Sequence, residues 1–159
     1  MSRLSVAAVA FVAALAAVPA LAAPGAPGHG HETFAAGEPG NPKKPARVVS
    51  ITMRESDGKM MFVPDRIEIK RGEQIRFKLN NIGELDHEFI IDSTPNNIKH
   101  AKEMEKNPEM EHDDPNARRL KPKAADELVW RFTKRGTFEY GCLIPGHREA
   151  GMTGIIVVK

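Results

Sequence analysis

Apolar and polar side chains alternate along three stretches in the first half of the chain. Apolar residues occupy every second position within Val49–Met53, Ile67–Ile69 and Ile75–Leu79. Because successive side chains of a strand point to opposite faces, this period of two predicts half-buried β-strands. Turn-forming pairs such as Asp57-Gly58 separate the stretches and predict short antiparallel connections.

The same alternation returns near the C-terminus. Two stretches, 128–133 and 137–142, carry apolar side chains at every second position, and the chain closes with a third apolar run. In the second stretch Phe138, Tyr140 and Cys142 share one face. We therefore expect the thiol of Cys142 to point into the core at the end of its strand.

The alternation stops in a segment from about residue 93 to residue 125. Helix-forming residues occupy Asn97–Lys106, and Pro108 and Pro115 follow them. This pattern predicts a short helix inside a long insertion. Several short strands separated by turns predict an all-β fold, a Greek-key β-sandwich with the partly helical insertion before its last strands.

The first residues of the chain have the composition of a targeting signal. Residues 1–22 combine one positive charge, Arg3, with an Ala/Val-rich apolar run, which predicts a secretory signal peptide cleaved near Ala22. The apolar run is too short to span a bilayer. We therefore expect a protein exported to the periplasm, with no membrane partner once the signal is removed.

A Pro/Gly-rich segment follows the predicted signal. Residues 23–46 contain too few large apolar residues to form a core, so the sequence predicts a flexible arm that carries His29 and His31. The remaining residues, 47–159, have the usual size of one domain.

Charge and cysteine content narrow the function. The formal net charge is +2, and no cluster of basic and aromatic residues occurs, which argues against nucleic acid as a partner. Exported proteins of this size generally use cysteines in disulfides, but Cys142 is the only cysteine. It is therefore a buried thiol, half of an intermolecular disulfide, or a metal ligand.

The neighbours of Cys142 favour the interpretation that it is a metal ligand. The loop over residues 140–152 also carries the imidazole of His147 and the thioether of Met152. Thiolate and thioether favour Cu(I) and imidazole suits Cu(II), so copper is the first hypothesis. A site of two His, one Cys and a weak axial Met needs a second imidazole. His87 is the candidate, because it lies at a strand boundary whereas the other histidines lie in the predicted arm and insertion.

Ordinary packing, zinc binding and hydrolysis each fit only part of this ligand pattern. Taken singly, His87 fits an ordinary strand-end histidine and Met152 fits a core residue. A structural zinc site prefers several Cys and His ligands and has no use for Met152. A hydrolase with Cys142 as nucleophile and His147 as base needs an orienting third residue and an oxyanion pocket, which the sequence does not identify.

Two motifs together resemble the cupredoxins, the type 1 copper proteins. The first is an Asn-x-Gly turn at 81–83 followed by His-Glu-Phe at 87–89, and the second is the loop pattern Tyr-x-Cys-x4-His-x4-Met. The resemblance covers most of residues 47–159. Its insertion, rich in His and Met, makes the chain most similar to exported bacterial cupredoxins associated with copper tolerance, the CopI-like group.

The resemblance implies a set of ligands. His87, Cys142 and His147 would be the equatorial ligands of one copper ion, and Met152 the long axial ligand. Glu88 departs from the commonest cupredoxin pattern, in which a smaller polar residue follows the first His and braces the Cys loop. The sequence therefore leaves the bracing around the predicted site open.

Two further features have candidate roles. A second, softer copper site is a hypothesis for four residues of the insertion, whose methionines could equally be core residues; they are His100, Met104, Met110 and His112. Near His147, the apolar residues Leu143, Ile144 and Pro145 form a candidate electron-entry patch for a redox partner protein, or alternatively pack the loop.

The sequence thus predicts a periplasmic copper-binding protein with one-electron redox activity that serves copper tolerance. The alternative is a diffusible electron-transfer shuttle between redox enzymes, and a Cys-His hydrolase is a minor alternative. The predicted protein is not an enzyme, with weak Cu(I) oxidation as the one activity left open. The extra His and Met residues favour copper tolerance, since a pure shuttle needs no such ligands outside its redox centre.

Overall fold

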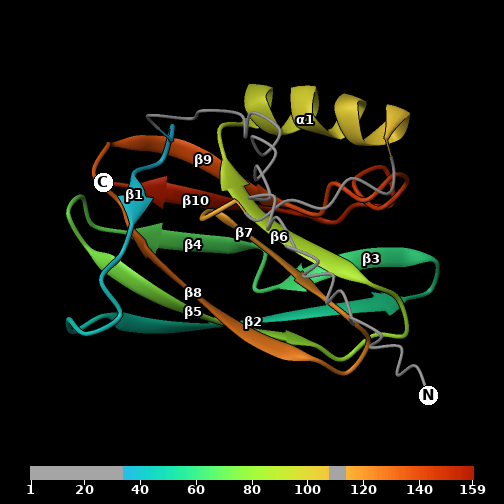
Figure 1. The fold of residues 1–159 in the computed structure, drawn as a ribbon, viewed down its shortest axis with the longest axis horizontal. Coiled ribbons are helices and arrows are strands. Elements are labelled where there is room, and N and C mark those ends of the chain that lie inside the picture. The colour runs from blue at the N-terminus through green and yellow to red at the C-terminus, as the bar shows by residue number, and fades with distance from the viewer. Residues whose placement is uncertain (1–33, 108–113) are drawn as a thin grey trace, which may run out of the picture. The chain divides into compact units, whose positions relative to one another are not determined.

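Two β-sheets enclose the core of the molecule (Figure 1). The computed structural model describes residues 34–107 and 114–159, which hold ten strands and one helix. The first sheet has the strand order β1 (Glu38–Pro39), β8 (Ala125–Arg131), β5 (Gln74–Asn81), β2 (Arg47–Ser56), β3 (Lys59–Val63). The second sheet has the order β4 (Arg66–Ile69), β10 (Thr153–Val158), β9 (Gly136–Gly141), β6 (His87–Asp92), β7 (Ala117–Leu120). The predicted all-β sandwich is confirmed.

The strands pair in both directions. β2 and β3 form an antiparallel hairpin at Asp57 and Gly58, both of which have positive φ. β2 also pairs with β5, and β4 with β10, and these two pairs are parallel. The prediction of antiparallel connections is wrong there, because the chain crosses to the second sheet at β4 and returns to the first at β5.

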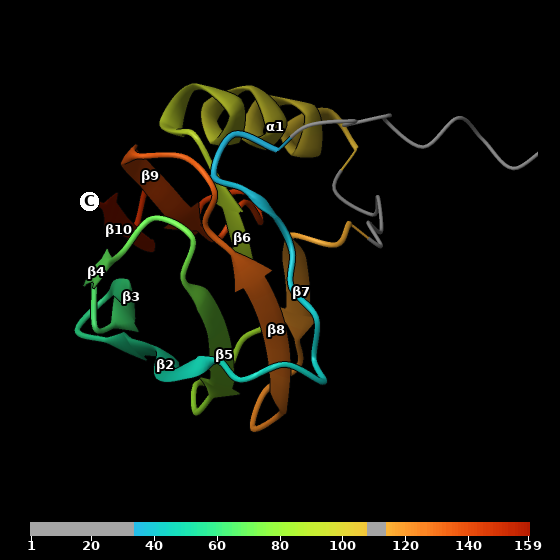
Figure 2. The same ribbon diagram turned by 90° about the vertical axis from the view of Figure 1, so that its left-hand side faces the viewer.

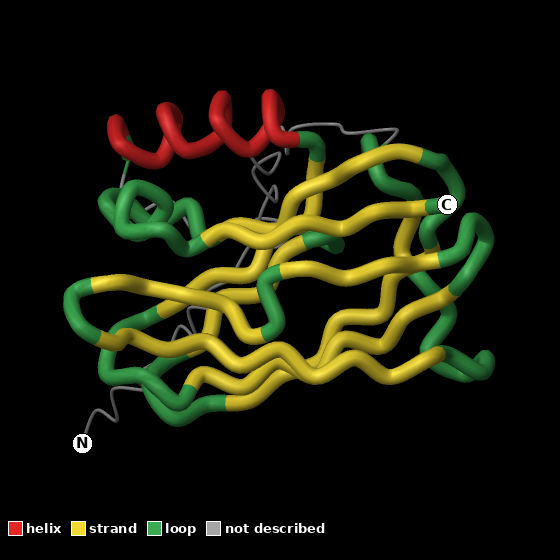
Figure 3. Tube along the Cα trace, turned by 180° about the vertical axis from the view of Figure 1, so that it is seen from behind, coloured by secondary structure: helices red, strands yellow, loops and turns green. Residues whose placement is uncertain are grey.

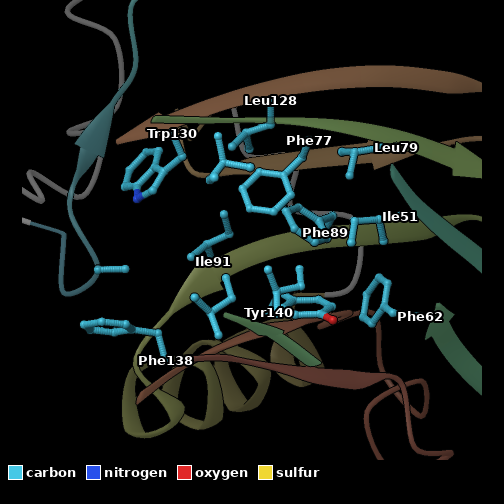
Figure 4. Close-up of a cluster of buried hydrophobic side chains, with 14 of the residues drawn as sticks. Ile51, Phe62, Phe77, Leu79, Phe89, Ile91, Leu128, Trp130, Phe138 and Tyr140 are labelled. Carbon is cyan, nitrogen blue, oxygen red and sulfur yellow. The ribbon is translucent and has the colours of Figure 1, made fainter. Parts of the chain in front are cut away.

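Aromatic rings join the two sheets. Figure 4 shows side chains of the first sheet, among them Phe77, opposite Phe89 and Tyr140 of the second. The ring centroid of Phe89 lies 5.2 Å from that of Phe77 and 5.2 Å from that of Tyr140. These rings are fully buried and form the centre of the core that supports both sheets.

The helix α1 (Thr94–Lys106) lies against the outer face of the second sheet, beside β6 and β9 (Figure 2). The predicted helix, Asn97–Lys106, is confirmed but begins three residues earlier. Ser93 caps it by accepting the backbone N–H of Asn96. On its inner side Met104 is buried in a small cluster with Ile90 of β6, together with Ala117 and Leu143.

The insertion also supplies an edge strand that the sequence did not predict. β7 pairs with β6, so that Arg119 lies opposite Glu88 and Leu120 opposite His87. Its four residues, Ala-Arg-Arg-Leu, lack strict alternation of apolar and polar positions, which explains why periodicity missed it. The insertion therefore completes the sheet beside His87.

The domain begins earlier than predicted. Residues 34–46 belong to the predicted flexible arm, but β1 pairs with β8, Ala36 is fully buried and the Phe34 ring contacts Trp130 edge-on at 5.1 Å. At Gly37, φ is +151° and a Cβ would lie 2.0 Å from a backbone oxygen of β8. The arm prediction is thus wrong for residues 34–46, because a few apolar side chains and a glycine suffice to dock them.

The earlier predicted segments lie outside the described residues. These are the signal peptide at 1–22 and the first part of the arm, with His29 and His31. In the part of the chain that the structure describes, α1 is too short and too polar to cross a membrane, and no longer apolar helix occurs.

Candidate metal centre

Three of the predicted ligands meet at one end of the sandwich. His87 is the first residue of β6, Cys142 directly follows β9, and His147 lies in the loop between β9 and β10. β6 and β9 are paired neighbours in which Ile90 lies opposite Gly141. The sheet therefore brings together residues that lie far apart in the sequence.

The ligand atoms of these side chains point at one another. His147 Nδ1 lies 3.3 Å from His87 Nδ1 and 3.3 Å from Cys142 Sγ. The three atoms lie within 4.8 Å of one another, and they form the one His/Cys/Asp/Glu cluster of this kind among the described residues. A trigonal ion with bonds of about 2.0–2.3 Å separates its ligand atoms by roughly 3.5–4 Å. The cluster fits one copper ion after small movements.

The loop between β9 and β10 is held by main-chain bonds. In Figure 3 this loop is the compact green coil below the left-hand end of the red helix. The Cys142 N–H donates to the Met152 carbonyl at 3.1 Å, and the Met152 N–H donates to the His147 carbonyl at 3.1 Å. The Met152 side chain is fully buried. The backbone thus fixes the three predicted ligands of the loop relative to one another.

Burial favours the neutral forms of both the Cys142 thiol and the His147 imidazole. Burial raises the pKa of the Cys142 thiol to about 12, although the backbone N–H of Glu88 donates to Sγ at 3.3 Å and acts in the opposite direction. Burial and the neighbouring His87 lower the pKa of His147 and favour its neutral, metal-binding form. A cysteine nucleophile needs a lowered pKa, so these values disfavour the hydrolase alternative.

Glu88 is an unusual buried carboxyl next to this cluster. Its side chain points away from Phe89 and toward the covered outer face of the sheet, the residue is only 4 % exposed, and its Oε2 has no hydrogen-bond partner among the described residues. Burial raises its pKa to about 7, although the Leu143 backbone and the charge of Arg119 oppose this. The fold therefore holds this carboxyl more easily as the neutral acid.

We expect Glu88→Gln to change how stability depends on pH. The pKa of Glu88 is about 7 in the folded protein, against an ordinary value of 4.5. Between these values only the unfolded chain releases the proton, so stability falls as pH rises from about 4.5 to 7, by up to about 3 kcal/mol. Urea unfolding of the metal-free protein at pH 5 and pH 8 should show this loss in the wild type and not in Glu88→Gln.

A matched control separates this effect from general charge. Glu149→Gln removes an exposed carboxyl from the loop between β9 and β10 and should keep the wild-type pH dependence. Equal pH dependence in the wild type and in Glu88→Gln would contradict the assignment of the buried acid.

Two polar residues that the sequence did not single out as site residues organise the segment before His87. Asn81, at the end of β5, donates through Nδ2 to the carbonyls of Leu85 and Leu120 and accepts the N–H of Gly83. Glu55, at the end of β2, contacts His87 Nε2 through Oε1 at 2.8 Å. The Asn-x-Gly turn was a usable signal for Asn81, but no local pattern marks Glu55.

The predicted electron-entry patch needs a correction. Leu143 is 1 % exposed and packs beneath α1 with Met104 and Ile90, so it is not a surface residue. The outer face of β9 is covered by the helix, which sequence alternation alone does not reveal. Ile144 is half-buried and Pro145 is exposed, so only these two of the three residues reach the surface.

The candidate second copper site is not brought together in the described residues. Met104 is 1 % exposed within the cluster under α1, which is the packing role that the sequence left as its alternative. His100 is half-buried on the same helix. Met110 and His112 lie outside the described residues.

Comparison with known proteins supports copper. The family described as copper binding proteins, plastocyanin/azurin family, matches residues 49–159. A copper-resistant cuproprotein CopI of Rubrivivax gelatinosus is 44% identical over 132 residues, which are 82% of this chain and 78% of that protein. A copper-resistant cuproprotein CopI of Pseudomonas aeruginosa is 32% identical over 154 residues, covering 79% of this chain and 83% of that protein.

A solved structure shares the fold. The dithionite-reduced auracyanin of the photosynthetic bacterium Roseiflexus castenholzii superimposes with a TM-score of 0.60 at 18% identity. The match covers 73% of this chain and 99% of the auracyanin chain. At this identity the likeness concerns the β-sandwich alone.

Proposed function

Because this chain belongs to the plastocyanin/azurin family of copper-binding proteins, we propose that it is a periplasmic copper protein with one-electron redox activity that serves copper tolerance. Copper is its cofactor. The observation that carries the proposal is the convergence of one thiol and two imidazole nitrogens, from Cys142, His87 and His147, within 4.8 Å.

In this proposal each ligand has a distinct part. His87 and His147 would hold copper through Nδ1 as neutral imidazoles, and Cys142 would hold it as the thiolate. Met152, buried at the end of the same loop, would be a weaker fourth ligand that tunes the reduction potential. Copper supplies a one-electron couple, and the protein holds ligands that suit both oxidation states.

Copper tolerance is favoured over a shuttle on two grounds. Two relatives with broad coverage of this chain are named copper-resistant cuproproteins. The predicted signal peptide directs the protein to the compartment where external copper first arrives. The shuttle remains the second candidate, because the same copper site serves either role.

Electrons would pass through the exposed side of His147. Its ring is half-buried, with half-buried Ile144 and exposed Pro145 three and two residues before it. An apolar rim of this kind lets a redox partner protein come close to the metal without a large desolvation penalty. The partner is therefore expected to present a small apolar surface around its own electron-transfer group.

A strain that lacks the gene tests this function. We expect the deletion to make cells sensitive to copper with normal respiration, because the lost protein handles copper. The wild-type gene should restore growth on copper, and Cys142→Ser should not, although the variant protein accumulates. A respiratory or photosynthetic defect at low copper, without copper sensitivity, would favour the shuttle.

A further inference from the structure

The carboxylate of Glu55 lies behind the copper-facing side of His87. It contacts His87 Nε2 at 2.8 Å through Oε1, while His87 Nδ1 lies on the side of His147. Glu55 also accepts the backbone N–H groups of Glu84 at 3.0 Å and Leu85 at 3.1 Å. One carboxylate thus joins the end of β2, the segment before β6 and the first predicted ligand.

The segment before His87 is built around this carboxylate. A Cβ at Gly83 would lie 2.2 Å from Oε2 of Glu55, so only glycine leaves room for the carboxylate there. Asn81 fixes the same turn by accepting the N–H of Gly83 and donating to the Leu85 carbonyl. The position of Glu55 is therefore set by the protein backbone and does not depend on a bound metal.

The contacts of Glu55 determine which ring nitrogen of His87 carries the hydrogen. Glu55 already accepts two backbone N–H groups, from Glu84 and Leu85, and such donors favour the ionised carboxylate. An ionised carboxylate only accepts hydrogen bonds, so His87 donates from Nε2–H. Its Nδ1 then keeps the lone pair that a metal needs.

We propose that Glu55 is a positioning residue of the copper centre, which holds His87 with Nδ1 free for copper and lowers the reduction potential of the bound ion. The proposal rests on the ligand set proposed above. His87 is fully buried and the Glu55 side chain is 24% exposed, so the negative charge acts through a poorly hydrated ring. Cu(II) carries one more positive charge than Cu(I), so the negative charge of Glu55 stabilises Cu(II) more than Cu(I).

The main test is the reduction potential of Glu55→Gln. Hydrogen-bond partners of metal-binding histidines change metal affinity by about 10–100-fold. At a fixed solution potential, we expect the Cu(I)/Cu(II) ratio to rise about tenfold in this variant, which corresponds to about 59 mV for one electron. The Cu(II) affinity should fall by a similar factor.

Glu84→Gln is the matched control. Glu84 lies on the same segment, its side chain is 81% exposed and it pairs with Lys123 instead of His87. Removal of this solvated charge should change the potential far less, because water and salt screen it. A shift in Glu55→Gln no larger than that in Glu84→Gln would overturn the proposal.

A second variant covers the case in which Glu55→Gln does not fold. Gly83→Ala adds the Cβ that displaces the Glu55 carboxylate and leaves every charge in place. We expect a rise of the reduction potential that is smaller than in Glu55→Gln. An unchanged potential in Gly83→Ala would then overturn the proposal.

A third readout does not need copper. In the metal-free full-length protein, ¹⁵N NMR should show His87 with its hydrogen on Nε2, and Glu55→Gln should increase the share of the Nδ1–H form. Equal tautomer populations in both proteins would overturn the positioning role. The visible thiolate-to-copper band of the wild type tests the ligand set separately, so the two failures are distinguishable.

Discussion

Cys142→Ser should abolish the intense visible absorption that the wild type shows with one equivalent of Cu(II). This band arises from charge transfer between a covalently bound thiolate and copper, and Cys142 is the only cysteine in the chain. The serine hydroxyl is a harder, neutral ligand, so the affinity for Cu(I) should fall by at least about 100-fold. Optical and EPR titrations of the purified protein with Cu(II) measure the band, and competition with a chromogenic Cu(I) chelator measures the Cu(I) affinity.

The control for this titration is His100→Asn. His100 belongs to the candidate second site, and α1 carries it on the outer face of the second sheet. This variant should keep the visible band, and a loss of copper bound beyond one equivalent would assign that copper to the insertion. A wild type without the band, or a band that survives in Cys142→Ser, would contradict the type 1 site.

The proposed ligand set could be predicted from the sequence because its motifs are local. Cys142, His147 and Met152 occur on one loop, and His87 follows a recognisable turn. Glu55 could not be predicted in this way, because its contact with His87 spans 32 residues and depends on how β2 ends beside the segment before β6. Long-range polar contacts of this kind leave no periodic trace in the chain.

The burial of both faces of β6 and the burial of Leu143, neither of which alternation revealed, have a common physical cause. Alternation of apolar and polar residues identifies strands that have one buried and one solvent-exposed face. It predicted β2, β5 and β8 correctly. All six residues of β6 are buried, because α1 covers its outer face and β7 pairs along its edge. The helix α1 also buries Leu143, which was predicted to lie on the surface.

Phe89→Ala should give the largest loss of stability among single core substitutions close to the site. Phe89 is fully buried and its ring contacts Phe62, Phe77 and Tyr140, so truncation removes these ring contacts at the centre of the core and leaves a cavity. Substitutions of this type cost about 3–5 kcal/mol. Urea unfolding of the metal-free protein should show a lower midpoint.

Binding of copper should restore part of the stability lost in Phe89→Ala. Phe89 lies two residues after His87 on β6, and a ligand that binds only the folded protein stabilises it by about 4 kcal/mol at 1,000 times its dissociation constant. Copper-loaded Phe89→Ala should therefore keep the visible band and unfold at a higher urea concentration than its metal-free form.

The control Ile155→Ala removes a side chain that is 42% exposed and should cost about 0.5 kcal/mol or less. Equal losses in both variants would contradict a core centred on Phe89, and loss of the band in Phe89→Ala would show that this ring also positions His87.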